Sequence, residues 1–440
     1  MLEPLYTADE MRAAEAGHDV EAMMERAGRG VAESVLRRFP EARRIACVCG
    51  RGANGGDGRI AARVLREAGR DAVEELDGGP VDVVVDALFG TGFHGEPRAD
   101  AVSLIERMNG AGAPVVAVDV ASGVNASTGE VAGEAVRAAV TVTMHAPKVG
   151  LVVAPGQFHT GEIDVVDIGL ERAETEHRLV TDEVLSRVPR RREGDNKYSA
   201  GAVLVVGGAP GLTGAACLAA EAAFRADAGY VAVAVPERSL PIVEQRLLEA
   251  VKRTLDEVDE LLPRMDALAL GPGLGRGEEQ RALVRRLLSE SSLPAVVDAD
   301  GLHELEPFER DAPTVLTPHE GELARLLGQE SRWVAAHRLE ALRQGVARFG
   351  CVVLLKGADT LVGAPGAGVL VRSANAPGLA TAGTGDVLTG IVAAFLAKGL
   401  DAQLAAAAAA VAQARAARLA PQQAGLVASD VVALLPRALA

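Results

Sequence analysis

The 440-residue chain is poor in aromatic residues and in positive charge, and each shortage excludes a class of structure or partner. Aromatic residues make up only 3% of the chain, so its hydrophobic cores must be built from Val, Leu, Ile and Ala. The net charge of -15 argues against a nucleic-acid binder, because such a surface needs clustered Lys and Arg. Small anionic ligands remain possible, since backbone N–H groups at helix starts can bind them.

Cysteine is also scarce. The four cysteines, Cys47, Cys49, Cys217 and Cys351, are scattered, which indicates a reducing compartment rather than a disulfide framework. Cys47 and Cys49 alternate along an expected strand, so both should lie on one face of a sheet. We interpret them as small buried hydrophobic residues rather than as metal or redox ligands.

The sequence has no long hydrophobic run. Its longest apolar stretch, residues 404–412, is too short to span a bilayer. The first 15 residues lack the basic and apolar regions of a secretory signal. We therefore expect a cytoplasmic protein that binds neither membranes nor nucleic acid, and we expect it to form a homo-oligomer.

Hydrophobic runs alternate with helical stretches along the first part of the chain. Residues 7–10 predict a capping box that opens a helix, and a second helix is expected over residues 21–39. Residues 45–49 form an apolar run, and residues 81–85 and 115–118 are short and β-branched, as is typical of buried parallel strands. The alternation predicts an α/β fold.

The composition changes between residues 171 and 197, where charged residues replace the hydrophobic runs. We place a boundary near residue 175 and expect two domains, residues 1–175 and 178–440, with residues 171–195 as an exposed connection. The alternation then restarts. Strands are expected over residues 203–206, 231–235, 267–270, 295–297, 314–316 and 352–355, and helices over residues 215–228, 386–398 and 402–419.

Three polar loops follow strand candidates in the first domain. Gly50-Arg-Gly-Ala-Asn-Gly-Gly-Asp-Gly58 opens a helix, where glycines let the backbone approach a phosphate closely. Asp86-Ala-Leu-Phe-Gly-Thr-Gly92 and Asp119-Val-Ala-Ser-Gly123 end two further strands. The carboxyl ends of parallel strands share one edge of a sheet, so the loops should form one binding crevice. A plain turn capped by Asp57 is the alternative for the first loop.

These loops and Ala146-Pro-Lys-Val-Gly150 resemble, in order, the motifs of the NAD(P)H-hydrate epimerase family over roughly residues 1–170. The resemblance implies a Rossmann-like three-layer domain that binds hydrated nicotinamide cofactor and uses a potassium ion. It places Asp119 at the nicotinamide end as a catalytic residue. The residues that it places at the ligand are Ala53, Asn54, Gly55, Gly56, Asp57, Gly90, Thr91, Gly92, Phe93, His94, Gly95, Glu96 and Asp119. Those that it places around potassium are Asn54, Asp86 and Ser122, whose oxygens suit a hard cation.

Three positions depart from the usual pattern of that family. Ala53 stands where Asn is usual, Ala121 where Pro is usual, and Asn125 where an acidic residue is common. A different interpretation makes this half a ligand-sensing or partner-binding module without catalysis. Ala53 favours that interpretation mildly, whereas the intact Asp86 and Asp119 argue against it.

A second set of motifs lies in the other half. The segment from Asn375 to Asp386 is rich in small residues and ends in Gly383-Thr-Gly-Asp386 before a helix. Successive N–H groups at a helix start can bind an anion, and Asp386 can take a proton from a hydroxyl. The alternative is a Gly-rich loop in which Asp386 only stabilises the helix dipole. Three further turns end strand candidates: Gly271-Pro-Gly-Leu-Gly275, Thr317-Pro-His-Glu-Gly-Glu322 and Lys356-Gly-Ala-Asp-Thr360.

With Thr213-Gly-Ala-Ala216 and Val297-Asp-Ala-Asp-Gly-Leu302, these motifs resemble the NAD(P)H-hydrate dehydratases of the ribokinase-like superfamily over roughly residues 178–440. Sugar kinases of that superfamily have Asn-x-x-Glu where this chain has His319-Glu-Gly-Glu322. The resemblance makes Asp386 the catalytic base. It places the adenine nucleotide at Lys356, Gly357, Ala358, Asp359, Thr360 and Gly385, and the hydrated cofactor at Ala215, Gly273, His319 and Asp386.

Together the two resemblances imply a bifunctional metabolite repair enzyme, an isomerase fused to a lyase. The first half would interconvert the R and S forms of hydrated NADH and NADPH (NADHX and NADPHX). The second would dehydrate the S form with ADP and Mg²⁺, giving AMP and phosphate. The Gly-Thr-Gly-Asp loop alone leaves open a ribokinase-like kinase for a small-molecule hydroxyl. The product would discriminate, because a kinase accumulates a phosphate ester whereas a dehydratase releases phosphate.

Overall fold

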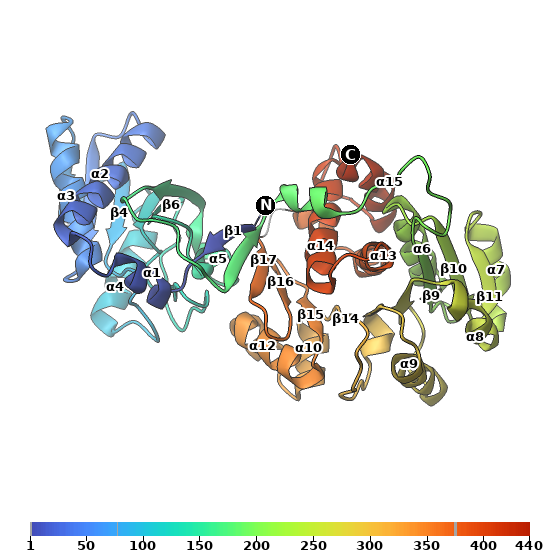
Figure 1. Cartoon of the computed structure of the whole chain (residues 1–440). Coiled ribbons are helices and arrows are strands. Elements are labelled where there is room, and N and C mark those ends of the chain that lie inside the picture. The colour runs from blue at the N-terminus through green and yellow to red at the C-terminus, as the bar shows by residue number, and fades with distance from the viewer. Residues whose placement is uncertain (1, 77, 374–375) are drawn as a thin grey trace. The chain divides into compact units, whose positions relative to one another are not determined.

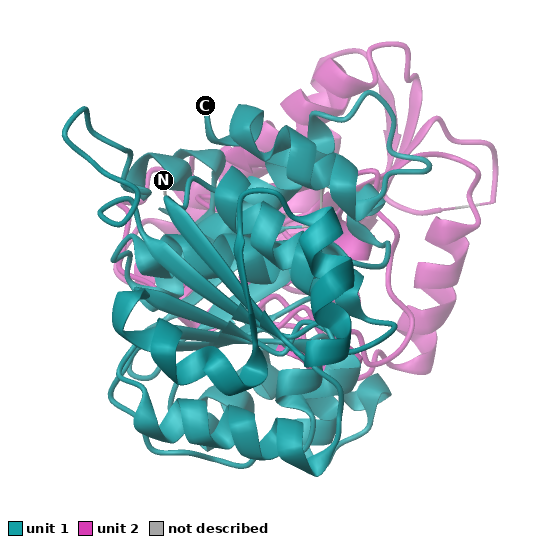
Figure 2. Ribbon diagram, turned by 90° about the vertical axis from the view of Figure 1, so that its right-hand side faces the viewer, with its two compact units in different colours: residues 1–3, 179–334, 339–440 teal, residues 4–178, 335–338 magenta. Residues whose placement is uncertain are grey.

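The computed structural model describes residues 2–76, 78–373 and 376–440, so Asn375 lies outside the described residues. The chain divides into two compact units, which Figure 2 colours separately. The N-terminal unit consists of Pro4–Arg178 with Ala335–Arg338. The C-terminal unit consists of Leu179–Val334 and Leu339–Ala440, together with the start of the chain. None of the helices in the described part of the chain is long and apolar enough to cross a membrane.

The N-terminal unit is built on a six-stranded sheet, β3-β2-β4-β5-β6-β7, in which every neighbouring pair is parallel. Its strands are β2 (Arg44–Cys49), β3 (Asp71–Val73), β4 (Val83–Ala87), β5 (Val115–Val118), β6 (Val140–Met144) and β7 (Glu162–Val166), and its helices are α1 (Ala8–Glu15), α2 (Val20–Arg38), α3 (Ala53–Glu67), α4 (Ala99–Asn109), α5 (Gln157–Thr160) and the 3₁₀ turn η1 (Val149–Leu151). The expected capping box is present, with Thr7 as the N-cap of α1. Figure 1 labels most of these elements.

Helices α2 and α3 pack on one face of this sheet. They bury Val31, Val35 and Leu65 against alternate residues of β2, β4 and β5. Cys47 is fully buried there and Cys49 packs at the edge of the same cluster, so the two cysteines share a face as predicted.

The C-terminal unit contains most of an 11-stranded sheet of the order β1-β8-β17-β16-β15-β14-β13-β12-β9-β10-β11. The strands from β15 to β11 in that order are parallel, and β16 and β17 pair antiparallel. The strands are β1 (Leu2–Leu5), β8 (His177–Val180), β9 (Ala202–Val206), β10 (Tyr230–Val235), β11 (Val251–Thr254), β12 (Ala267–Leu270), β13 (Ala295–Val297), β14 (Thr314–Leu316), β15 (Val352–Leu355), β16 (Thr360–Gly363) and β17 (Val369–Arg372).

Helices cover this sheet on both faces. Val203 and Val205 of β9 face one hydrophobic cluster, whereas Leu204 and Val206 face the other. The α-helices are α6 (Thr213–Arg225), α7 (Leu240–Arg246), α8 (Val258–Leu261), α9 (Glu278–Glu290), α10 (Glu320–Leu327), α11 (Ser331–Ala336), α12 (Arg338–Phe349), α13 (Thr384–Ala397), α14 (Ala402–Arg418) and α15 (Ala428–Leu439). The short 3₁₀ helices are η2 (Asp182–Arg187), η3 (Glu237–Ser239), η4 (Leu255–Glu257), η5 (Leu262–Arg264), η6 (Ala299–Leu302) and η7 (Pro377–Leu379).

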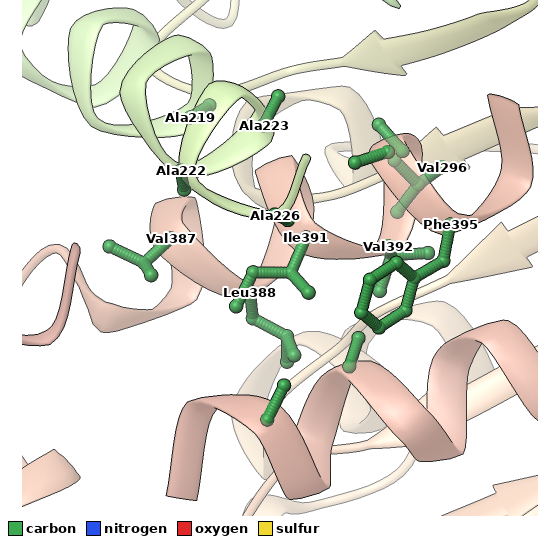
Figure 3. Close-up of a cluster of buried hydrophobic side chains, with 14 of the residues drawn as sticks. Ala219, Ala222, Ala223, Ala226, Val296, Val387, Leu388, Ile391, Val392 and Phe395 are labelled. Atoms are coloured by element: carbon green, nitrogen blue, oxygen red, sulfur yellow. The ribbon is translucent and has the colours of Figure 1, made fainter. Parts of the chain in front are cut away.

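The core beneath the Gly-rich loop is made largely of alanine and aliphatic residues. Figure 3 shows Val387, Ile391 and Phe395 of α13 near the alanines of α6, and all of these residues are fully buried. Small side chains let two helices approach closely, which is how a core with few aromatic residues reaches high packing density. The core therefore holds α13, whose N-terminus carries the Gly-rich loop, firmly in place.

The segment of residues 171–195 departs from its prediction as an exposed connection. Its middle forms β8 and η2, and Val180, Val184, Leu185 and Val188 are buried in the core of the C-terminal unit. The prediction was wrong because the segment as a whole is rich in charged residues, and its average composition does not reveal these four apolar residues. The exposed connecting parts are shorter and lie on either side of them.

Two candidate active sites

The sites predicted in the N-terminal unit lie at the carboxyl ends of β2, β4 and β5. The chain passes from β2 to β3 on one side and then to β4 on the other, so the strand order reverses there, as it does at ligand crevices of open α/β sheets. A cavity of about 1030 Å³ occupies this position. The predicted residues that line it are Ala53, Asn54, Asp57, Gly90, Thr91, Gly92, Phe93, His94, Glu96 and Asp119.

Two predicted glycines of the first loop serve packing instead. A Cβ on Gly55 would lie 1.9 Å from the carbonyl oxygen of Gly50, so only glycine fits at this fold of the loop. A Cβ on Gly56 would meet the Sδ-bound methyl group of Met24 at 2.1 Å. Gly95 is not among the residues that line the cavity. It has a positive φ of 76° and connects His94 with Glu96, which both line it.

The three residues predicted to hold potassium are joined by one network of hydrogen bonds. Asp86 is fully buried and accepts bonds from the backbone N–H and the hydroxyl of Ser122, at 2.8 and 2.6 Å. The N–H of Phe89 donates to the Ser122 hydroxyl, and Asn54 donates to the Phe89 carbonyl at 2.7 Å. Burial raises the pKa of Asp86 to about 6 against the opposing bonds from Ser122 and Leu88. The network thus gathers oxygen atoms around a buried carboxylate.

Asp119 is held in a defined position. It follows β5 with a left-handed backbone, φ 67°, which is uncommon for a residue with a side chain and typical of functional sites. Its Oδ1 accepts bonds from the Lys148 ammonium at 2.5 Å, the Thr143 hydroxyl at 3.1 Å and the Met144 N–H at 3.3 Å. Lys148 is fully buried. The Asp119–Lys148 pair is therefore a buried ion pair at the cavity wall.

Two further acids share the cavity with Asp119. Asp57 in α3 and Glu15, the last residue of α1, both line it. Burial, reinforced by the nearby Asp119 and Glu15, raises the pKa of Asp57 to about 7. Burial and Asp119 also raise the pKa of Glu15.

Sequence reasoning missed both Lys148 and Glu15. Lys148 lies inside the Ala146–Gly150 motif. A lysine between apolar residues was the feature of the sequence that could have marked it as a buried site residue. Nothing in the sequence marked Glu15, because helix α1 comes to the cavity only through the tertiary fold.

The predicted residues of the C-terminal unit also gather at one sheet edge. Gly273 follows β12, Asp298 follows β13, His319 follows β14 and Lys356 follows β15. The start of α13 completes the group, since a Cβ on Gly385 would lie 3.4 Å from Nζ of Lys356 and 3.5 Å from Oδ2 of Asp298. Gly383, the N-cap of α13, has φ 88°, which favours glycine.

Asp298 connects the strand ends to α13. Lys356 donates to its Oδ1 at 2.6 Å, and Thr389 of α13 donates to its Oδ2 at 2.7 Å and to the Gly385 carbonyl at 3.1 Å. Burial alone would raise the pKa of Asp298, but Lys356 and Thr389 lower it, so the group is an ionised carboxylate. Asp298 belongs to the Val297–Leu302 motif of the dehydratase resemblance, but the sequence did not predict it as a site residue.

Asp386 lies in the first turn of α13, as predicted, and is half-buried. Burial, together with Asp298, raises its pKa to about 7, although Lys356 opposes the shift. A carboxyl group with a pKa near neutrality can accept a proton from a substrate and return it, which is what a general base requires.

The other predicted residues surround this group. His319 is exposed and caps α10, accepting bonds on Nδ1 from Gly321 and Glu322. Ala215 and Gly273 lie together, since a Cβ on Gly273 would be 3.1 Å from the Ala215 side chain. In the stretch predicted for the nucleotide, Gly357 and Ala358 are exposed, whereas Asp359 and Thr360 are buried.

Comparisons with known proteins match both units. Residues 203–437 match the family model described as NAD(P)H-hydrate dehydratase, and residues 20–74 and 70–150 match the model described as YjeF-related protein N-terminus. A bifunctional NAD(P)H-hydrate repair enzyme of Moorella thermoacetica is 39% identical over 94% of this chain and 91% of its own length. The enzyme of that description from Escherichia coli is 34% identical over 94% of this chain and 88% of its own length.

A solved structure resembles the C-terminal part. The ADP/ATP-dependent NAD(P)H-hydrate dehydratase from Bacillus subtilis, co-crystallised with ATP and Mg²⁺, aligns with a TM-score of 0.55 at 28% identity. The alignment covers 59% of this chain and 96% of that chain. The α/β fold predicted for this half, ribokinase-like in its resemblance, is thereby confirmed.

Proposed function

Since the chain belongs to the family of bifunctional NAD(P)H-hydrate repair enzymes, we propose that its N-terminal unit epimerises hydrated NADH and NADPH and its C-terminal unit dehydrates the S form with ADP. In each unit the predicted motifs follow the carboxyl ends of parallel strands, and those of the N-terminal unit line a cavity. The observation that carries the assignment is the position of Asp386, at a helix start, beside a buried Lys356–Asp298 pair.

In the N-terminal unit, the cavity of about 1030 Å³ is large enough for a dinucleotide, and Asp119 is one of the residues that line it. The start of α3 offers free N–H groups for the pyrophosphate, and the loop of residues 90–96 forms another wall. Asp119, fixed by Lys148, would contact the nicotinamide ring. This arrangement supports a reaction at the hydrated ring rather than ligand binding alone, because buried ion pairs and left-handed backbone are costly to maintain without use.

A potassium ion fits the oxygen atoms of Asn54, Asp86 and Ser122. No basic side chain pairs with the buried Asp86 among the described residues, so a monovalent cation would offset its charge. Amide, carboxylate and hydroxyl oxygens are ligands that hard cations prefer. The ion would hold the loops at the ends of β4 and β5 in position beside the ligand.

In the C-terminal unit, the chain's residues perform a phosphoryl transfer followed by an elimination. Asp386 takes the proton of the hydroxyl on C6 as that oxygen attacks the terminal phosphorus of ADP and the bond to AMP breaks. The N–H groups at the start of α13 stabilise the negative charge that develops on the phosphate. Phosphate then leaves C6, driven by the lone pair of the ring nitrogen, and loss of a proton from the neighbouring carbon restores NAD(P)H.

Lys356 and its neighbours would bind the phosphates. The ammonium group of Lys356 lies 2.6 Å from the Asp298 carboxylate and 3.9 Å from the Glu322 carboxylate. Mg²⁺ would arrive with the phosphates of ADP, and Glu322 provides an oxygen ligand of the kind that Mg²⁺ takes beside them.

One experiment tests the whole assignment. The full chain is incubated with a mixture of R and S NADHX, with and without ADP, and the products are separated by chromatography. We expect the epimers to equilibrate without ADP, and with ADP we expect complete conversion to NADH, AMP and phosphate. A stable phosphate ester would instead identify a kinase, and unchanged epimers without ADP would refute the epimerase.

A further inference from the structure

Asp57 differs from every other acid of the N-terminal cavity in one respect. Its side chain is 9% exposed, and its Oδ1 is buried with no hydrogen-bond partner among the described residues. Buried polar atoms are paired in the great majority of cases, so an unpaired one on a residue that lines a cavity indicates a group that meets its partner in a ligand. A carboxyl oxygen can donate a hydrogen bond to a ligand only when it carries a proton.

Asp119 faces the same cavity in the opposite condition. Its Oδ1 accepts three hydrogen bonds, one of them from the buried Lys148, and Lys148 also donates to Thr143 and to the Met144 carbonyl. The ion pair with Lys148 holds the Asp119 carboxylate in place at the cavity wall. The cavity thus contains two carboxyl groups in different surroundings. In other enzymes with two active-site acids, such a difference lets one act as the proton donor while the other stabilises positive charge.

The charges around Asp57 explain its protonation. Burial acts first, and the negative charges of Asp119 and Glu15 add to it, raising the pKa of Asp57 to about 7. The ammonium group of Lys148 forms its ion pair with Asp119 and not with Asp57. The other charged groups that line the cavity are Arg51, His94, Glu96, Arg98 and Asp100, and they lie in the loops at its rim and at the start of α4.

We propose that Asp57 is the catalytic acid of the epimerase, donating its proton to the hydroxyl on C6 of the hydrated cofactor while Asp119 stabilises the cation that forms. The proposal rests on the epimerase function proposed above for this cavity. It assigns a proton route to a reaction in which the carbon that changes configuration bears both a hydroxyl and a bond to the ring nitrogen.

The step balances without any further reagent. The C6–O bond breaks, the oxygen leaves as water with the proton of Asp57, and the ring nitrogen's lone pair forms a C=N bond. Asp57 is left as a carboxylate, and the positive ring is paired with Asp119. Water then adds to the opposite face of the planar ring, and its proton returns to Asp57 directly or through water in the cavity. The other epimer and the starting enzyme result.

The test compares Asp57→Asn with the wild-type chain, using pure R-NADHX without ADP and following the S form by chromatography. Loss of a positioned acid should lower kcat by about 10²–10⁴-fold while KM changes only a few-fold. Dehydration of the S form with ADP, in the other unit, should be unchanged and reports that the chain is folded. Asp71→Asn, an exposed acid at the start of β3, is the matched control.

The pH profile separates a catalytic from a structural role. Because the protonated form acts, wild-type epimerisation should fall as the pH rises past about 7. In Asp57→Asn the small remaining rate should lose that fall, whereas His94→Gln should keep it, which excludes the imidazole at the rim. A kcat of Asp57→Asn within a few-fold of wild type would overturn the proposal. So would a pH fall that persists in Asp57→Asn, or a loss that appears in Glu15→Gln instead.

Failure of the proposal can be told from failure of the epimerase function itself. If the wild-type chain does not interconvert the epimers at all, the proposed function is wrong. If the wild type interconverts them and Asp57→Asn does so equally well, the function stands and only the role of Asp57 is wrong.

Discussion

Replacing Asp386 with Asn should remove the base of the dehydratase and leave its fold unchanged. Asn has almost the same shape, so it keeps the first turn of α13 and the Gly383–Gly385 backbone that we propose to contact the nucleotide. What it removes is the capacity to accept the proton of the substrate hydroxyl. A positioned base contributes about 10²–10⁴-fold, so the rate of dehydration should fall by that factor.

The stability of the protein should hardly change. An acid in the first turn of a helix contributes roughly 0.3–1 kcal/mol through the helix dipole. At Asp386 this gain is opposed by burial and by the negative charge of Asp298, which together raise its pKa to about 7. The side chain is therefore about half protonated at neutral pH, and its loss should shift Tm only slightly. A large loss of activity with a small shift in Tm is the signature of a catalytic group.

The assay measures recovery of NADH absorbance from S-NADHX and ADP. In the wild type the carboxylate is the active form, so the rate should fall about tenfold per pH unit below about 7 and level off above it. Asp386→Asn should lose that dependence, and its epimerase activity should stay intact. Asp401→Asn is the control, since Asp401 caps α14 away from the site and Asn caps a helix equally well. Dehydration by Asp386→Asn within a few-fold of wild type would refute the assignment.

Three other predictions concern the ion, the buried pair and the division of the chain. Exchange of potassium for sodium should slow epimerisation, and Asp86→Ala should abolish both that dependence and most of the activity; equal rates in the two salts would count against the ion site. Asp298→Ala should lower the free energy of unfolding by about 3 kcal/mol in urea, because it removes the nearer of the two carboxylates that pair with Lys356; an unchanged unfolding midpoint would contradict this. A cut near residue 175 should give one fragment that epimerises and one that dehydrates only the S form. Activity that returns only on mixing the fragments would show that β8 needs β1 beside it in the sheet.

Much of the fold could be predicted because buried parallel strands are short hydrophobic runs. The predicted strands at residues 115–118 and 267–270 coincide with β5 and β12. Several edge strands escaped prediction, because one or both of their sides meet water, and the buried inner strands β6 and β16 were missed as well. In β7, Glu162 and Asp164 face arginines of α2. Strand β11 contains Lys252 and Arg253. Neither strand is therefore a hydrophobic run that a sequence pattern could identify.

The candidate sites were predicted only in part for a related reason. Asp119 and Asp386 follow glycine-rich or strand-end motifs, and such local patterns can be recognised in one stretch of sequence. Their partners come from elsewhere in the chain: Lys148 bonds to Asp119 from 29 positions away, and Asp298 reaches Thr389 across 91 positions. No local pattern reveals a pair at that separation.

Local sequence patterns were enough to locate the candidate chemistry. The chain's hydrophobic periodicity specified two α/β sheets, and its loops specified which residues stand at the carboxyl ends of strands, because both properties are local. Only the tertiary structure decided how those residues behave. Burial and neighbouring charge bring the pKa of Asp57 and of Asp386 to about 7, whereas Asp119 is held in an ion pair with Lys148. The protonation of a carboxyl group depends on the dielectric and the charges within a few ångströms, and folding alone assembles those from distant parts of the chain.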